Sequence, residues 1–409
     1  MYELLIIPIF FLWLLFQRIR KIHSLDHISF LFFIWFVTSI VGYLYTKTTI
    51  LYEGKGSVTI LAVLYLLLMF YICMQPLQKS KILTHENYIV DSTDLLKWAM
   101  YLIAICSYLP FLENILHLIS GNNISTLGEN YEMRNDSVSF DARAHMSWLG
   151  ARLNSITLLC KYITPFILMN YLSTDKKKNI FLIIGLLMGI FNPAICMFNM
   201  GSRWVAIEDI FFFTFLFILY RNLFSEKIRR NIHFIFISIV CFLVIGIISI
   251  TIGRFEDTNY NLNEWMYRYI GEGYYNFSSD MWYVDSTSNG MHIFRDFYEN
   301  AISRLNRLMG IRMYVFYTYV GDFFADFGII GCMVICILLG LLGKKLSSLK
   351  EYSIYSVFTF SMYCKVFLTG FTYIVYINTL PELIIGSLFF VICKYSNNKK
   401  QALIYRKHF

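Results

Sequence analysis

Charged residues are scarce in this sequence, and long apolar runs take their place. Of the 409 residues, 15% are charged and 57% are hydrophobic, whereas a soluble globular protein has roughly 25% charged residues. A chain this poor in charge has too few polar groups to cover a water-facing surface, so most of it is expected to face hydrocarbon. The composition argues against a soluble enzyme and predicts an all-α integral membrane protein, with residues 1–409 forming a single domain.

Signals that would direct or cross-link the chain are also missing. The N-terminus has no basic segment before its first apolar run, and its charges follow that run, which is the reverse of a signal peptide. The nine cysteines all fall inside apolar runs, so neither a disulfide framework nor a CxxC metal site is predicted. We therefore expect a first membrane helix with its N-terminus outside.

Several well-known catalytic motifs are absent as well. The sequence contains no GxxxxGKS/T, HExxH or GxSxG motif. Nucleotide hydrolysis, zinc proteolysis and serine hydrolysis therefore have no support. We predict neither a metal site nor a cofactor.

Eleven apolar runs approach the length of about 20 residues that a helix needs to cross a bilayer. They lie at about 2–16, 28–45, 57–74, 98–119, 149–172, 180–198, 204–220, 232–252, 322–343, 352–369 and 375–393. The pattern predicts a polytopic bundle of about 11 transmembrane helices.

The distribution of Lys and Arg predicts the orientation of this bundle. One set of alternate loops holds most of the 35 Lys and Arg residues, and loops of this kind stay in the cytoplasm. This places the N-terminus outside, the C-terminus inside and two long polar intervals outside. They are residues 253–310, between the eighth and ninth predicted helices, and residues 120–148.

The interval 253–310 is the predicted working surface. It contains no lysine but five arginines, among many acidic and aromatic residues. A guanidinium group binds phosphate or carboxylate through two hydrogen bonds, whereas an ammonium group acts as a point charge. Loops of this length are usually functional or disordered, and this one is too aromatic to be disordered. We therefore predict a large extracytoplasmic loop that binds an anion.

Charged residues elsewhere on the predicted outer side allow two interpretations each. Arg143 and His145 belong to a charge cluster that is either simply solvated or part of a binding surface. Arg203 follows a Gly-Ser turn, and it either pairs with Glu208 or binds an anion.

A glycan carried on a polyprenyl pyrophosphate fits these residue types. Aromatic faces suit sugar rings, carboxylates suit sugar hydroxyls, and guanidinium groups at the headgroup level suit a pyrophosphate. Fixed positive charges stabilise a departing pyrophosphate, and a base accepts the proton of the attacking hydroxyl. The predicted chemistry is glycosyl transfer that needs no metal.

Four motifs carry a resemblance to a known family. They are GSR at 201–203, Gly253-Arg254, MYRYIGEG at 266–273 and GDFFADFGIIG at 321–331. With the 11-helix arrangement, they make the chain resemble the O-antigen and capsule repeat-unit polymerases of bacterial envelopes (the Wzy-type family). The resemblance implies transfer of a growing glycan from undecaprenyl pyrophosphate to the next lipid-linked repeat unit, with inversion.

The resemblance also implies roles for particular residues. Arg203 and Arg254 match arginines that bind pyrophosphate, and Arg268 is expected to act with Arg254 in catalysis. Glu272 is the first candidate for the base, before Asp280 and His145. The residues expected to bind pyrophosphate or glycan are Arg203, Arg304, Arg307, Arg143, Asp280 and His145.

The same resemblance implies a location and partners. The protein is expected to be a multi-pass protein of the bacterial cytoplasmic (inner) membrane, with its active site facing the periplasm. Its expected partners are undecaprenyl-pyrophosphate-linked oligosaccharide and membrane lipids, with a chain-length regulator protein as a further candidate. An extracytoplasmic site argues against nucleic acid as a partner.

Two alternative functions remain open. An O-antigen ligase-type glycosyltransferase would use the same donor with another acceptor, and His292 is the one histidine in the large interval. A flippase for lipid-linked oligosaccharides would be a transporter, and Lys161 and Lys365 inside apolar runs fit buried cations of such a protein.

Overall fold

The described part of the chain forms two compact units of helices. The computed structural model describes residues 2–47, 57–90, 93–121, 145–174, 177–255, 262–284, 286–291, 316–373 and 379–407. Unit 1 comprises Met1–Ile82, Tyr260–Lys350 and Phe360–Thr379, and unit 2 comprises Leu83–Asn259, Glu351–Thr359 and Leu380–Phe409. The single domain expected for residues 1–409 stays a prediction.

The apolar helices confirm an all-α polytopic membrane protein. Within the described ranges, seven helices are long and apolar enough to cross a membrane, or eight if one bent pair counts as a single span. Each of the eleven predicted apolar runs coincides with a helix or, at 149–172, with that bent pair. The number of eleven spans and the N-out orientation stay predictions.

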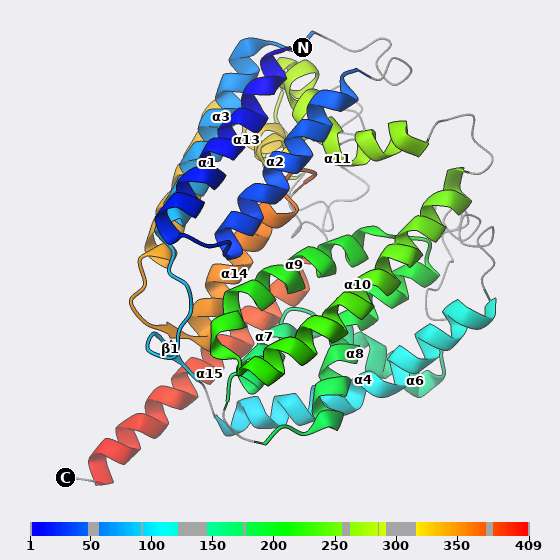
Figure 1. The fold of residues 1–409 in the computed structure, drawn as a ribbon, viewed down its shortest axis with the longest axis vertical. Helices are drawn as coiled ribbons and strands as arrows, with labels where there is room; N and C mark the ends of the chain where they lie inside the picture. Colours follow the sequence, from blue (N-terminus) through cyan, green and yellow to red (C-terminus); the bar gives the residue numbers. More distant parts are fainter. Residues whose placement is uncertain are drawn as a thin grey trace. The chain divides into compact units, whose positions relative to one another are not determined.

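Unit 1 is built around four long helices and one amphipathic helix (Figure 1). Its helices are α1 (Ile6–Ile22), α2 (His27–Tyr45), α3 (Ile60–Met74), α11 (Leu262–Ser279) and α13 (Thr318–Ser347), with the second part of α14 (Ile354–Leu368). Short 3-10 helices cover Tyr2–Leu5, Gln75–Lys79 and Met281–Tyr283. The fully buried Trp35 centres the core, with its ring 4.7 Å from Phe70 and its Nε1–H donating to the Phe367 carbonyl at 2.6 Å.

The helix α11 corrects one expectation, because it lies within the interval predicted as a loop. Residues 271–279 of α11 are buried, and the helix packs against α2. The contact depends on two glycines: a Cβ on Gly271 would stand 2.6 Å from the Cα of Gly42. Small residues let helix backbones approach this closely, so a polar segment enters the bundle where the sequence suggested exposure.

A break in α13 follows its two buried acidic residues. Gly328 has φ 65° and ψ −169°, a conformation that only glycine adopts readily. The carbonyl groups of Ala325 and Asp326 before the break accept hydrogen bonds from the amides of Ser288 and Asn289 at 3.0 and 2.9 Å. The segment 286–291 thus satisfies backbone groups that the interrupted helix leaves without helical partners.

Unit 2 is a second helical bundle (Figure 1). It contains α4 (Asp94–Gly121), α6 (Trp148–Leu159), α7 (Thr164–Leu172), α8 (Ile180–Asn199), α9 (Trp204–Tyr220), α10 (Glu226–Phe255) and α15 (Leu380–Lys407), with a 3-10 helix at Arg221–Leu223. The strands β1 (Tyr88–Ile89) and β2 (Tyr352–Ser353) pair in parallel, with Tyr88 opposite Tyr352. Helix α4 packs on α6 and α8.

Amide side chains hold α4, α6 and α8 together inside this bundle. Asn192 donates to the Oδ1 of Asn154 at 2.7 Å and to the Oγ1 of Thr157 at 2.9 Å, and its own Oδ1 accepts from Asn114 at 3.0 Å. All four side chains are buried. Polar side chains that bond one another across membrane helices stabilise such contacts by about 1 kcal/mol each.

Candidate functional site

The predicted site residues fall on both units. Arg268, Glu272 and Asp280 belong to unit 1, and His145, Arg203 and Arg254 belong to unit 2. Arg254 lies in the last turn of α10, and its side chain is outside the described part of the structure. Arg143, Arg304 and Arg307 lie outside the described residues, as does His292.

Arg268 and Glu272 form an ion pair along α11. The Nε–H of Arg268 donates to the Oε2 of Glu272 at 3.1 Å, across one helical turn. The second oxygen of Glu272 accepts from the backbone amide of Phe316 at 3.1 Å. The Glu272 side chain is 2% exposed, whereas that of Arg268 is 28% exposed. A buried carboxylate thus orients a guanidinium group that reaches the surface of unit 1.

The residues around this pair fix its geometry. Asn276, one turn after Glu272, donates to the carbonyl of Phe316 at 3.1 Å, so two side chains of α11 hold the same backbone segment. The Phe316 ring stacks on Tyr373 at 5.9 Å. Asp280 lies at the end of α11, where its Oδ1 accepts from Ser279 at 3.0 Å.

Unit 1 contains an aromatic group centred on Trp282, which follows α11 in the chain. The ring of Trp282 lies 5.4 Å from Tyr65, 6.4 Å from Phe277 and 5.8 Å from Phe324. Trp282 and Tyr65 are both partly exposed. Partly exposed aromatic faces can cover the apolar face of a sugar ring while their polar atoms stay hydrated.

Two buried acidic residues of α13 belong to unit 1 as well. Asp322 is 3% exposed and Asp326 is fully buried, and both precede the break at Gly328. Asp326 accepts a hydrogen bond from the Ser288 hydroxyl. Asp326 therefore helps to fasten the segment 286–291 to α13.

Arg203 joins α9 to α10 in unit 2. It occupies the N-cap position of α9, after the turn at Gly201, whose φ is 65°. Its Nη1 donates to the Oγ1 of Thr251 at 2.5 Å, and the residue is 9% exposed. Its predicted partner Glu208 is bonded to Lys161.

Lys161 lies at the bend between α6 and α7. Helices α6 and α7 meet at 72° across residues 160–163. The Nζ of Lys161 lies 3.1 Å from the Oε1 of Glu208 and 3.6 Å from the Oδ1 of Asp209. All three side chains are buried, so one cation faces two carboxylates in a low-dielectric environment. Broken helices with charged groups at membrane depth often mark a functional position.

His145 is connected to the amide side chains of unit 2. Its Nε2 lies 2.9 Å from the Oδ1 of Asn114, and its ring stacks on His117 at 4.1 Å. Since the Nδ2 of Asn114 donates to Asn192, the Oδ1 of Asn114 must accept. This assignment makes the Nε2–H of His145 the donor, so neutral His145 carries its lone pair on Nδ1.

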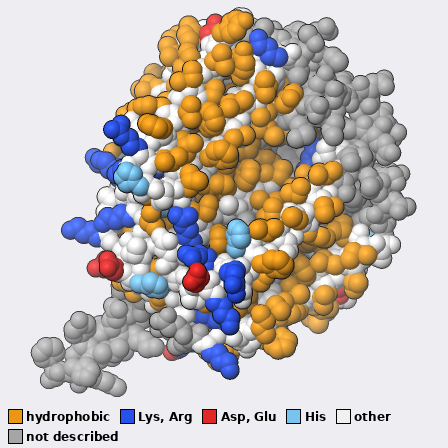
Figure 2. Space-filling view, viewed as in Figure 1, with side chains coloured by type: hydrophobic (Ala, Val, Ile, Leu, Met, Phe, Trp, Pro, Cys, Tyr) orange, Lys and Arg blue, Asp and Glu red, His pale blue; other side chains and the backbone are white. Residues whose placement is uncertain are grey.

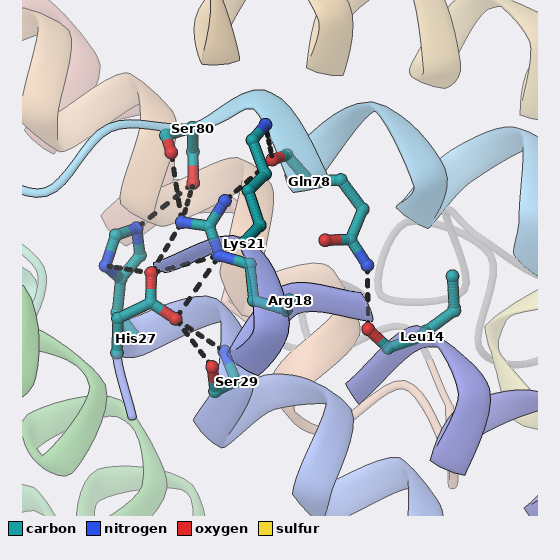
Figure 3. Close-up of polar contacts among 8 residues, drawn as sticks. Leu14, Arg18, Lys21, His27, Ser29, Gln78 and Ser80 are labelled. Carbon is teal, nitrogen blue, oxygen red and sulfur yellow. Dashed lines mark hydrogen bonds and ion pairs between the residues drawn. The ribbon is translucent and has the colours of Figure 1, made fainter. Parts of the chain in front are cut away.

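A second buried ion pair, in unit 1, has the features of a structural contact (Figure 3). The fully buried Arg18 donates to Asp26 at 2.5 Å, to the carbonyl of Gln78 at 2.7 Å and to that of Ser80 at 2.9 Å. Burial opposes ionisation of Asp26, but His27 and the Arg18 guanidinium outweigh it and lower the pKa of Asp26 from 3.8 to about 2. The sequence analysis missed this pair, because Arg18 follows an apolar run among other basic residues.

Comparison with known proteins gives no further guide. No family model matches the chain, and neither a curated protein nor a solved structure matches it. Within the described ranges, no group of three or more His, Cys, Asp and Glu side chains could hold a metal ion. The function must therefore be argued from the arrangement of the side chains.

Proposed function

We propose that this protein polymerises oligosaccharide repeat units carried on undecaprenyl pyrophosphate, at the outer face of a bacterial cytoplasmic membrane. The observation that supports this most is Arg268, a partly exposed guanidinium group oriented by a buried carboxylate on α11. A fixed cation of this kind stabilises the charge that develops on a departing pyrophosphate. The partly exposed aromatic group around Trp282 supplies a surface for sugars in the same unit.

The proposed reaction is an inverting glycosyl transfer. The acceptor hydroxyl oxygen forms a bond to the anomeric carbon of the growing glycan, and the bond from that carbon to the pyrophosphate oxygen breaks. The pyrophosphate leaves with the electron pair, next to arginine side chains, and a base takes the hydroxyl proton. Fixed guanidinium groups supply the charge stabilisation in this proposal, which includes no metal or cofactor.

The contacts of Glu272 indicate a positioning role in this proposal. Its carboxylate is buried and bonded to both Arg268 and the amide of Phe316. A base must lie within hydrogen-bond reach of the substrate. The two carboxylate oxygens of Glu272 instead accept hydrogen bonds from Arg268 and from the amide of Phe316. Asp280 and His145 then remain the candidates for the base, and the amide network fixes the tautomer of His145.

A second candidate function is transport of the lipid-linked oligosaccharide. It is favoured by the break between α6 and α7, where Lys161 faces Glu208 and Asp209 inside the bundle. Discontinuous helices with charged groups at membrane depth are common in transporters. The ligase-type alternative shares the donor of the polymerase and differs in its acceptor.

Complementation of a gene deletion distinguishes these functions. If the deletion leaves the surface acceptor with one repeat unit and no ladder, the missing step is polymerisation. Loss of every repeat from the acceptor would contradict the polymerase, and glycan polymer accumulating on the lipid carrier would then identify the ligase.

Variants of Arg268 test the site within that experiment. We expect Arg268→Ala to abolish the ladder, with Arg268→Lys restoring a small part of it, because lysine keeps the charge but loses the planar fork. Arg152→Ala removes an exposed arginine of α6 and serves as the control with a normal ladder. Wild-type chain lengths from membrane-inserted Arg268→Ala protein would refute the assignment.

A further inference from the structure

Basic side chains gather where α9 ends and α10 begins in unit 2. A cavity of about 880 Å³ is lined there by Phe217, Arg221, Asn222, Glu226, Lys227, Arg229, Arg230 and His233. Glu226 is the one acidic residue of that lining, among the described residues. Figure 2 shows Lys and Arg side chains collected at this end of the two helices, beside apolar side chains. The cavity therefore has a strong excess of positive charge.

A second cavity, of about 590 Å³, shares Lys227 with the first. Its polar end includes Lys177, while Ile183, Ile232 and Ile235 line it further along α8 and α10. Lys178, at the same end, already donates to the Tyr171 carbonyl at 2.7 Å. The cavity thus changes from cationic to apolar along its length.

A small apolar space of about 20 Å³, the slot, adjoins the second cavity. It is lined by Leu168, Leu172, Ile183, Leu187, Phe213, Ile232, Ile235 and Ile239. Ile183, Ile232 and Ile235 line both spaces, so the two are continuous along α10. The span within α10 is only 6% buried by the protein, the lowest fraction among the described candidate spans. Its apolar side chains are therefore open to lipid.

The change from a cationic to an apolar lining within the second cavity matches one class of molecule. A soluble phosphate compound would use its basic end but not its apolar end, and an uncharged lipid would use the apolar end but not the lysines. An anionic amphiphile uses both, since ammonium groups bind a phosphate and isoleucines cover a hydrocarbon chain. Basic pockets between membrane helices are known to bind lipid headgroups in this way.

We propose that the second cavity binds an anionic phospholipid of the surrounding bilayer. Its phosphate lies at the basic end of this cavity, beside Lys177 and Lys227, and one acyl chain runs past Ile232 and Ile235. The positive-inside pattern predicts that this end faces the cytoplasm, whereas the proposed glycosyl transfer takes place at the outer face. The lipid site is therefore separate from the proposed active site and does not depend on it.

Native mass spectrometry of the purified full chain tests the site. The protein is incubated with phosphatidylglycerol or with phosphatidylcholine of the same acyl chains, and the bound lipid is counted. We expect retention of phosphatidylglycerol, and a roughly 30-fold loss of its affinity in Lys177→Gln/Lys227→Gln, since each cation near the headgroup contributes about 1 kcal/mol. The matched control Lys344→Gln/Lys345→Gln removes two exposed cations of unit 1 and should retain the lipid.

The apolar slot is tested by a separate variant. Ile235→Phe narrows the slot without changing any charge, so it should weaken binding of long-chain phosphatidylglycerol while leaving a short-chain analogue bound. Equal binding of both headgroups by the wild type would overturn the proposal. Equal loss in the two double variants would do so as well, as would displacement of the lipid by free glycerol phosphate at equal concentration, which would identify a soluble ligand.

Discussion

Each unit buries an ion cluster, and the two clusters differ in the number of carboxylates that meet the cation. In unit 1, Arg18 meets Asp26, and backbone carbonyls accept further hydrogen bonds from the same guanidinium group. In unit 2, Lys161 meets both Glu208 and Asp209 at the bend between α6 and α7. Neighbouring carboxylates disfavour each other's ionised form. The second cluster is therefore the one expected to respond to a proton.

The cost of burying charge explains why this difference matters. A buried ion pair contributes little net stability, but loss of one partner leaves a charge that neither water nor protein compensates. Where two carboxylates lie together, one of them can reduce this cost by binding a proton, because a nearby like charge disfavours the ionised form. We therefore expect the two clusters to react differently when their cation is removed.

Removal of Arg18 should have the largest effect on stability. Arg18→Met leaves Asp26 buried beside carbonyl oxygens, and we expect a loss of about 3–5 kcal/mol, measured as a lower thermal midpoint in detergent. Replacing Asp26 as well, in Arg18→Met/Asp26→Asn, should recover part of the loss. Lys97→Met is the control, because Lys97 and Asp94 form an exposed pair worth at most about 1 kcal/mol. An Arg18→Met protein as stable as this control would remove the contrast between the clusters.

Removal of Lys161 should have a smaller effect that depends on pH. In Lys161→Met, Glu208 and Asp209 can share a proton, so we expect a loss of about 2–3 kcal/mol at pH 8 that shrinks as the pH is lowered toward 5. The thermal midpoint is measured against pH for wild type and variant. Lys161→Met/Glu208→Gln/Asp209→Asn, which removes the cation together with both carboxylates, should lose the pH dependence. A deficit of equal size at both pH values would show that the carboxylates do not take up a proton.

The stability of the Arg18–Asp26 cluster should depend on pH in a lower pH range. Because the folded protein lowers the pKa of Asp26 from 3.8 to about 2, this carboxylate stabilises the fold by about 2 kcal/mol above pH 4. That contribution falls as the pH drops from about 4 toward 2, since the unfolded chain takes up the proton first. Asp26→Asn should flatten the thermal midpoint in this window, and an unchanged slope in the variant would contradict the assignment.

Much of the fold could be predicted from apolar runs, but one helix could not. Each predicted run became a helix because a span of about 20 apolar residues has few other stable structures in a bilayer. Helix α11 carries Arg268 and Glu272 and has no such run, so its sequence resembled a loop. It is buried because Gly271 meets Gly42, two residues that lie far apart in the chain.

The candidate site likewise combines contacts that the sequence predicts with contacts that only the packing of helices creates. Arg268 and Glu272 are four residues apart, so their pairing followed from helical spacing once a helix was present. The amide of Phe316, which binds the other oxygen of Glu272, has no signal in the sequence. No sequence pattern predicts the contacts among Asn114, Asn154 and Asn192, since these side chains meet only when three helices pack.

The sequence by itself determined that this is a helical membrane protein, where its apolar helices lie, and which residue types its polar intervals contain. These properties depend on local composition, because hydrocarbon selects apolar helices one segment at a time. Only the tertiary structure decided which buried charges meet. Lys161 received two carboxylates and Arg18 received one because the packing of distant helices, and not the neighbouring sequence, chooses the partners of a buried charge.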